Sequence, residues 1–453
     1  MPIRYYSTNG KSPKASFEEA LLTGQASDKG LYMPDTIPRL SRKTIASFAE
    51  RSYPEIAFSV MQLFLEGVVP DDVLKRMASE AYTFAVPVER VYDERYLLRL
   101  DGGPTGAFKD FAALMLARLF EYFQKKESDK LLILVATSGD TGGAVANAFY
   151  GCEKTRVIVL FPDNEVSIIQ RKQMTTFGGN ITAYAVDGTF DDCQAMVKRA
   201  FADPALKHIR MSSANSINFG RLMPQIVYYF YAYSRVVRNI GDFENKSASG
   251  GEVVFSVPSG NMGNMVAGVF AKKMGLPVRR IIAAHNENDE FVTFLRTGVY
   301  KPIAGVKKCL STAMNIGNPS NLARLIALYG GHIDEKATIH TVPDMAQMKN
   351  NIAAVSISDS ETVETIKAVY NKYNTILDPH SAVGWAALDI IDTSLPCIST
   401  ATAHPAKFAD MLRSLSITPD EHYGITQVIQ KEEIDTEKLS RYEELLHRIR
   451  SLG

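Results

Sequence analysis

The sequence has few cysteines and no net charge. Its cysteines, Cys152, Cys193, Cys309 and Cys397, are far apart, and no C-x-x-C pair occurs. This pattern argues against a disulfide scaffold, a zinc ribbon and a dithiol redox site. Lysine plus arginine (50) equals aspartate plus glutamate (50), which argues against a surface that binds nucleic acid or anionic membranes. A small anionic substrate remains compatible, because it needs only a local cationic pocket.

Long apolar runs are also missing. Apolar runs such as 131–136 and 157–161 are far shorter than the roughly 20 residues of a membrane-spanning helix. The first residues, MPIRYYSTNGKSPKASFEE, lack the apolar core of a secretory signal. No internal repeat of solenoid length is visible. We therefore expect a soluble, cytoplasmic protein with a small-molecule substrate, without nucleic-acid or membrane partners and without a metal site.

The first 92 residues are predicted to be mainly helical. Ser16 and Glu19 form a capping-box pattern before a helix that ends near Gly24. Further helices are expected from about Arg42 and from about Asp71, where Pro70-Asp71-Asp72 is typical of a helix start.

From about residue 97 the pattern changes to short β-rich runs that alternate with helical stretches. The runs lie at 131–136, 156–161, 181–187, 252–257 and 278–284. Such alternation predicts an α/β fold with parallel sheets covered on both faces. The segment ENKSASGGE (244–252) is predicted to be a polar loop, and the charged tail after about 420 a surface helix.

A single lysine stands where a glycine-rich loop meets a helix, in DGGPTGAFKDFAA (101–113). In an ordinary helix Lys109 would lay its stem on the core and keep its ammonium in water. Among small and apolar residues at a positive helix end, however, the amine loses its proton more easily. A neutral amine is what Schiff-base chemistry requires.

Two other loops follow strands and open helices. In ATSGDTGGAV (136–145), hydroxyl groups and free amides at a helix N-terminus suit an anion, although an ordinary capped turn has the same composition. In VPSGNMGNMVAG (257–268), Gly260 and Gly263 allow the backbone to approach a phosphate. This loop lacks the G-x-G-x-x-G pattern and the Gly-Lys-Ser/Thr ending, so a single phosphate group fits it better than a nucleotide.

Two further segments also carry residues that suit a ligand. SSANSINFGR (212–221) places Asn215, Ser216 and Arg221 before an aromatic helix, a composition that suits a phosphate or carboxylate. In STATAHPAKF (399–408), a threonine hydroxyl is available for a ring nitrogen, unless the segment is a plain polar turn. One cofactor that carries an aldehyde and a phosphate, pyridoxal phosphate, explains these features together.

The chain resembles the threonine synthase family of fold-type II pyridoxal-phosphate enzymes along nearly its whole length. The resemblance rests on YYSTNG (5–10), GPTGAFKDF (103–111), ATSGDTGGA (136–144), SANSINFGR (213–221), VPSGNMGN (257–264), DPHSAVG (378–384) and TAHPAKF (402–408). The N-terminal block separates this family from the serine and threonine dehydratases. The resemblance implies two open parallel-sheet subdomains and a mainly helical N-terminal domain. We expect that domain at 1–92, a catalytic region at 93–430 whose smaller subdomain spans about 130–222, and a helical tail at 431–453.

The resemblance also implies roles for individual residues. Lys109 would be the Schiff-base lysine, and Thr402 would face the ring nitrogen. The cofactor phosphate would be held by Gly260, Asn261, Met262, Gly263 and Asn264. The substrate carboxylate would be faced by Thr137, Ser138, Asp140 and Thr141, and the substrate phosphate by Asn215, Ser216 and Arg221.

The implied activity is that of a carbon–oxygen lyase in the last step of threonine biosynthesis. It converts O-phospho-L-homoserine and water to L-threonine and phosphate, with Lys109 as the main proton shuttle. An alternative is a phospho-lyase that releases 2-oxobutyrate, phosphate and ammonia from the same site. A regulator without turnover would be expected to have lost the lysine or the phosphate loop, and both are intact. We expect a monomer or a homodimer.

Overall fold

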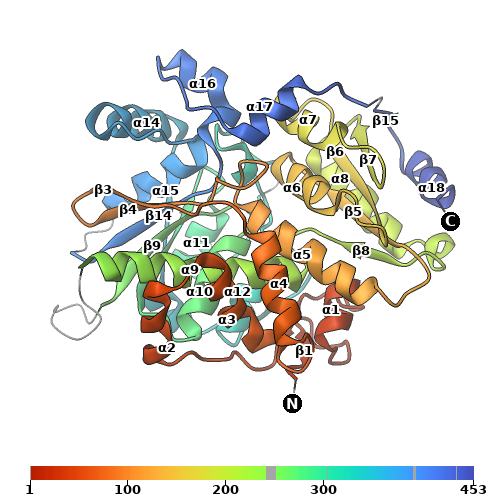
Figure 1. The fold of residues 1–453 in the computed structure, drawn as a ribbon, viewed down its shortest axis with the longest axis horizontal. Coiled ribbons are helices and arrows are strands. Elements are labelled where there is room, and N and C mark those ends of the chain that lie inside the picture. The colour runs from red at the N-terminus through yellow and green to blue at the C-terminus, as the bar shows by residue number, and fades with distance from the viewer. Residues whose placement is uncertain (1, 241–250, 304, 391–393, 435, 453) are drawn as a thin grey trace.

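The computed structural model describes residues 2–240, 251–303, 305–390, 394–434 and 436–452. Residues 244–250 of the expected polar loop lie outside the described residues. The fold is α/β, as predicted, and two sheets lie side by side with helices around them (Figure 1). None of the described helices combines the length and the apolar character that a membrane crossing requires.

The first sheet has the strand order β13-β10-β9-β14-β4-β3. Its strands are β3 (Val88–Tyr92), β4 (Arg95–Arg99), β9 (Val253–Pro258), β10 (Val278–His285), β13 (Ile352–Ser356) and β14 (Cys397–Ala401). Neighbouring strands are parallel except β3 and β4, which pair antiparallel. Of these strands, β9 and β10 match the predicted β-rich runs.

Helices cover both faces of the first sheet because successive residues of a buried strand point to opposite faces. Val254 of β9 belongs to one cluster with Trp385 of α15 (Pro379–Ile390). The next residue, Phe255, meets Tyr229 of α9 (Phe219–Ile240) with ring centroids 4.9 Å apart. The apolar run 252–257 therefore forms a strand that is buried on both sides.

The second sheet has the order β15-β7-β6-β5-β8 and is parallel throughout. Its strands are β5 (Leu131–Ala136), β6 (Thr155–Pro162), β7 (Ile181–Val186), β8 (Met211–Ser213) and β15 (Lys438–Leu439). The connecting helices are α6 (Asp140–Phe149), α7 (Ile168–Thr175) and α8 (Phe190–Ala202). The predicted runs at 131–136, 156–161 and 181–187 are confirmed as β5, β6 and β7.

The N-terminal part is mainly helical, as expected, and lies at the bottom of Figure 1. It contains β1 (Tyr5–Ser7), α1 (Phe17–Thr23), β2 (Tyr32–Pro34), α2 (Arg42–Ala46), α3 (Tyr53–Leu65) and α4 (Asp71–Ala81). The capping box of Ser16 and Glu19 is present, and Gly24 ends α1. The short strands β1 and β2 pair antiparallel. Helix α3 packs against α9, so this part shares the core of the larger body.

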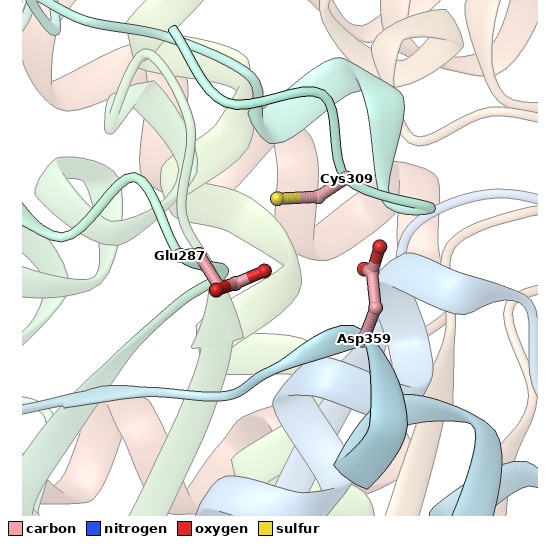
Figure 2. A group of neighbouring side chains, drawn as sticks. All are labelled: Glu287, Cys309 and Asp359. Atoms are coloured by element: carbon pink, nitrogen blue, oxygen red, sulfur yellow. The ribbon is translucent and has the colours of Figure 1, made fainter.

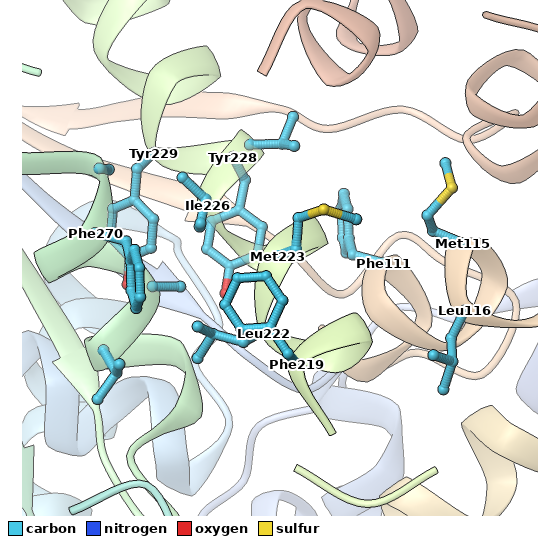
Figure 3. Packing of buried hydrophobic residues seen from close by; sticks show 14 of the residues in the cluster. Phe111, Met115, Leu116, Phe219, Leu222, Met223, Ile226, Tyr228, Tyr229 and Phe270 are labelled. Carbon is cyan, nitrogen blue, oxygen red and sulfur yellow. The ribbon is translucent and has the colours of Figure 1, made fainter. Parts of the chain in front are cut away.

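Helix α9 packs between α5 (Lys109–Gln124) and α10 (Gly263–Lys273). Figure 3 shows Phe111 of α5 on one side of α9 and Phe270 of α10 on the other. Tyr228 and Phe111 meet at 5.8 Å between ring centroids. Because α5 and α10 both begin at the pocket described below, this packing fixes the positions of two of its walls.

The remaining elements are helices and a further two-stranded sheet, together with the segments that lead to the second sheet. They are α11 (Glu290–Thr297), α12 (Leu322–Leu328), β11 (His332–Ile333), β12 (Ile339–Thr341), α13 (Met345–Asn351), α14 (Asp359–Tyr373), α16 (Ala409–Ser414), α17 (Tyr423–Gln430) and α18 (Tyr442–Arg450). After α16 the chain crosses to the second sheet, where β15 pairs with β7 and α18 packs on α8. The division at residues 92 and 430, with a smaller subdomain at about 130–222, stays a prediction.

Candidate active site

One pocket lies where several parallel strands end, at the point where ligands bind in open α/β sheets. Its walls begin just after β5, β8, β9 and β14 and at the start of α5. All candidate residues from the sequence line it: Lys109, Thr137, Ser138, Asp140, Thr141, Asn215, Ser216, Arg221, Gly260, Asn261, Met262, Gly263, Asn264 and Thr402. Segments as far apart in the chain as Lys109 and Thr402 therefore meet at one place.

Lys109 is the first residue of α5 and is mostly buried. Its Nζ lies 3.4 Å from Oδ2 of Asp140 at the start of α6, and 4.9 Å from the ring centroid of Phe108. Burial lowers the pKa of the Lys109 amine, Asp140 raises it, and the nearby Lys407 lowers it again. The net direction is downward, which favours the neutral amine that the sequence led us to expect.

Asp140 has partners that the sequence did not predict. Its Oδ1 lies 2.6 Å from Nζ of Lys407 and accepts a hydrogen bond of 3.0 Å from Nε2 of Gln170. Although burial raises it, the Lys407 and Lys109 ammonium groups hold the pKa of the Asp140 carboxyl well below its usual range. Asp140 is therefore an anion directed at two lysines, and its expected position facing a substrate carboxylate stays a prediction.

The start of α10 forms an anion cradle. Met262 adopts a left-handed conformation (φ 61°) in the turn before the helix. The first helical hydrogen bond comes from the Val266 amide, so the preceding amides of α10 have no partner inside the helix. An added Cβ at Gly260 would lie 2.6 Å from the carbonyl oxygen of Ala313. A side chain at this position would therefore displace the loop.

Asn264 completes this cradle. Its Oδ1 accepts hydrogen bonds from the hydroxyls of Tyr228 (2.6 Å) and Tyr229 (2.7 Å). This arrangement orients the amide, and its Nδ2 is buried without a hydrogen-bond partner among the described residues. A free N–H donor beside a helix N-terminus suits a phosphate group. The residues present therefore fit the phosphate of pyridoxal phosphate.

Arg221 stands in the first turn of α9 and is buried. One guanidinium nitrogen donates to the carbonyl oxygen of Ala214 at 2.7 Å, while Nε has no partner among the described residues. Burial lowers the pKa of Arg221 to about 10, which leaves it cationic at neutral pH. A buried cation with an unused donor suits a second anion. Ser216, whose hydroxyl is 3.0 Å from that of Ser320, lines the same pocket.

The start of α6 is organised by Thr137. Its Oγ1 accepts hydrogen bonds of 2.9 Å from the amides of both Gly139 and Gly142. The hydroxyl proton of Thr137 is not used in these bonds, so it can still be donated to a ligand. Gly139 has a φ of 135°, and an added Cβ there would collide with Gln170. The glycine therefore allows Gln170 to reach Asp140.

His380 of α15 also lines the pocket, and the sequence did not single it out. Its Nδ1 lies 2.7 Å from Oδ1 of the buried Asp378, and its Nε2 accepts a hydrogen bond from the Ala313 amide at 3.0 Å. An accepting Nε2 implies the neutral tautomer with the proton on Nδ1. The Asp-x-His spacing in DPHSAVG is the sequence feature that could have predicted it.

A group of possible metal ligands lies elsewhere in the described part of the chain. Figure 2 shows Glu287, Cys309 and Asp359 converging, with their ligand atoms within 4.8 Å of one another. Nζ of Lys307 lies 3.6 Å from Glu287, and the Leu310 amide donates to Asp359 at 3.0 Å. These contacts already compensate both carboxylates, and we assign no metal to the group.

Comparison with known families supplies the context for this pocket. A family model described as "Threonine synthase N terminus" matches residues 4–82, and one described as "Pyridoxal-phosphate dependent enzyme" matches residues 86–396. The second match ends before Thr402 and Lys407, so these two residues are placed by the structure.

Individual relatives match over almost the full length. The threonine synthase of Pseudomonas aeruginosa is 38% identical over 436 residues, which cover 92% of this chain and 91% of the relative. That of Escherichia coli is 35% identical over 416 residues, 91% of each chain. The crystal structure of pyridoxal-phosphate-bound threonine synthase from Brucella melitensis superposes with a TM-score of 0.90 at 34% identity and covers 99% of both chains.

Proposed function

We propose that this chain, which belongs to the threonine synthase family, converts O-phospho-L-homoserine and water to L-threonine and phosphate in the pocket around Lys109. The family and the fold expected from the motifs are confirmed, and the chain is a pyridoxal-phosphate-dependent lyase. One observation carries the choice of substrate. The pocket combines a lysine of lowered pKa with two groups of free donors, at the start of α10 and at Arg221.

We assign the two groups of donors to different ligands, one to the cofactor and one to the substrate. The amides at the start of α10 and the free Nδ2 of Asn264 would hold the cofactor phosphate, with Thr402 at the ring nitrogen. When bound, pyridoxal phosphate holds the substrate amino group and withdraws electrons from its α-carbon. The hydroxyl of a threonine does not force a proton onto the ring nitrogen, so it tempers that withdrawal.

Lys109 is the group that moves protons. Burial favours its neutral amine, which can remove the proton on the α-carbon and later return one there. Asp140, ionised and 3.4 Å away, stabilises the ammonium that forms in between. We propose that Thr137, Ser138 and Thr141 hold the substrate carboxylate, which keeps the α-carbon beside Lys109.

Arg221 would hold the phosphate that leaves. Its free Nε, together with Asn215 and Ser216, offers donors to an oxyanion in this pocket. Stronger binding of the departing phosphate than of its ester would assist the bond cleavage. The monomeric or dimeric state and the cytoplasmic location expected from the sequence stay predictions.

Product analysis tests the proposal. The purified protein with pyridoxal phosphate is incubated with O-phospho-L-homoserine, and threonine, phosphate and 2-oxobutyrate are measured in the same samples. Equal amounts of threonine and phosphate are expected, and L-homoserine without phosphate is the control substrate that should not react. Phosphate with 2-oxobutyrate and ammonia would instead identify the phospho-lyase.

A further inference from the structure

A second lysine shares the carboxylate of Asp140 with Lys109. Lys407 lies in the 3₁₀ turn η4 (Pro405–Phe408), and its side chain is 1% exposed. Its Nζ contacts Oδ1 of Asp140 at 2.6 Å and donates to the carbonyl oxygen of Thr105 at 3.2 Å. Asp140 lines the pocket and Lys407 does not, so Lys407 is connected to the pocket through the carboxylate of Asp140.

The charges around Lys109 come from several elements. Asp140 of α6 is an anion, while Lys407 of η4 and Arg221 of α9 contribute positive charge. His380 of α15 lines the pocket as a neutral ring, and the carboxyl of Asp110 is turned toward Thr105. The carboxylate of Asp140 thus stands between the amino groups of two lysines, of which that of Lys407 is both closer and more deeply buried.

A buried carboxylate is stable only beside a cation, and this requirement controls the protonation state of Lys109. If Lys109 were the only partner of Asp140, loss of its proton would leave an uncompensated charge in the interior, which is strongly unfavourable. With Lys407 in place, Asp140 keeps a partner whether or not Lys109 is protonated. The proton on Lys109 is then opposed by the positive charge of Lys407 as well as by burial.

We propose that Lys407 is a positioning residue that compensates the charge of Asp140 and thereby allows Lys109 to exist as a neutral amine. The contact with Thr105 gives Lys407 a second task. Thr105 belongs to the glycine-rich loop before α5, and its hydroxyl and amide both contact Asp110 in the first turn of that helix. Lys407 therefore ties the loop that carries Lys109 to the start of α6. This inference rests on the proposed role of Lys109.

The test measures the pKa of Lys109 itself. The cofactor-free full-length protein is labelled with acetic anhydride across a pH series, and acetylation of Lys109 is followed by peptide mass spectrometry. Lys407→Met, Asp140→Asn, the double variant and Lys407→Arg are compared with the parent. Lys126→Met makes the same chemical change at an exposed position and is the control.

Lys407→Met should raise the labelling midpoint of Lys109 by about 1–3 pH units, because the negative charge of Asp140 then acts on Lys109 without the opposing positive charge of Lys407. Asp140→Asn should lower the midpoint, and the double variant should lie between the two single variants. Lys407→Arg should stay near the parent, and Lys126→Met should match it. If Lys407→Met does not fold, the double variant must still show a higher midpoint than Asp140→Asn.

An unchanged midpoint in Lys407→Met, or a double variant that matches Asp140→Asn, would overturn the proposal. These outcomes are separate from a failure of the proposed function. The lysine that holds the cofactor is identified by reduction and peptide mapping of the loaded protein, and that result does not depend on Lys407.

Discussion

The guanidinium of Arg324 donates a hydrogen bond of 3.0 Å to the main-chain oxygen of Ser216. Arg324 is fully buried in α12 and also contacts the carbonyl oxygens of Tyr32 and Ile217 and the side chain of Asn321. These acceptors belong to the N-terminal part, the loop before α9 and the segment before α12. One side chain therefore joins three distant segments beneath the proposed phosphate site.

Replacing Arg324 should disturb both stability and substrate binding. Arg324→Met leaves several buried carbonyl groups without donors and should lower the free energy of unfolding by about 2–4 kcal/mol. KM for O-phosphohomoserine should rise more than kcat falls, because the Ser216 loop loses its support. Urea unfolding and steady-state kinetics measure the two effects. Arg413→Met, which removes an exposed arginine, should change neither, and equal effects in both variants would contradict this role.

Lys109→Ala should abolish covalent attachment of the cofactor. The parent protein should be yellow, and borohydride reduction followed by peptide mapping should place the label on Lys109, because its amine is buried and its pKa lowered. The variant should carry no reduced label and should not consume substrate. A label on any other lysine of the parent would remove both the attachment and the proton-shuttle role from Lys109.

Thr402→Val should keep the cofactor but slow the reaction. The start of α10 and Asn264 supply the anchoring contacts, whereas Thr402 offers one hydroxyl at the ring. Cofactor content and turnover should be measured on the same preparation, with near-parental content and reduced kcat expected. A colourless, cofactor-free variant would show instead that Thr402 is an anchoring residue.

Arg221→Ala should lower kcat/KM for O-phosphohomoserine. The fall should correspond to a loss of about 2–5 kcal/mol of transition-state stabilisation, the range for losing one partner of a desolvated charge pair. Cofactor absorbance should stay near that of the parent. Arg221→Lys should restore only part of the activity, because it offers a point charge in place of a planar fork.

The selectivity of this loss is the sharper measurement. Inhibition constants of amino-acid analogues with and without a phosphate group should be compared in parent and variant. Only the phosphate-bearing analogues should bind more weakly. Equal weakening of both kinds, or loss of cofactor, would place the substrate phosphate elsewhere.

Glu290 makes stability depend on pH. It begins α11, is buried, and its Oε2 has no hydrogen-bond partner among the described residues. Burial raises its pKa to about 7, above the ordinary carboxyl value. Its protonated form therefore fits the fold, and the stability it contributes is present at acid pH and lost as the pH rises through about 7.

Glu290→Gln should remove that dependence, because glutamine stays neutral. Between pH 5 and pH 8 the parent should lose about 1–3 kcal/mol of unfolding free energy relative to the variant. Thermal or urea unfolding across this range measures the difference. Glu421→Gln, at an exposed position, should follow the parent, and parallel curves for parent and Glu290→Gln would refute the assignment.

The parts of the fold that could be predicted from the sequence are those with strong local patterns. Runs such as 131–136 form strands because both faces are buried, and the capping box at Ser16 marks the start of α1. Strand β14 was not predicted, because CISTA (397–401) is short and mixes apolar with hydroxyl residues, and the strand is held by its neighbours β4 and β9.

The candidate site was predictable for the same reason and to the same extent. Its loops carry local compositions that suit anions, so residues such as Gly260 and Arg221 stand out in the sequence alone. Lys407 and Arg324 do not stand out, because the sequence alone does not distinguish a buried lysine or arginine from an exposed one. Their importance comes from partners that are up to about 290 residues away in the chain.

The pairing of β15 with β7 determines when the second sheet can be completed during synthesis of the chain. Residues 438–439 complete the edge of a sheet whose other strands end at residue 213. While the ribosome is still adding the intervening residues, the β7 edge presents unpaired amide and carbonyl groups to other nascent chains. A truncation that ends before residue 438 should therefore keep the pocket residues but leave the edge of β7 unpaired. We expect such a protein to aggregate during synthesis.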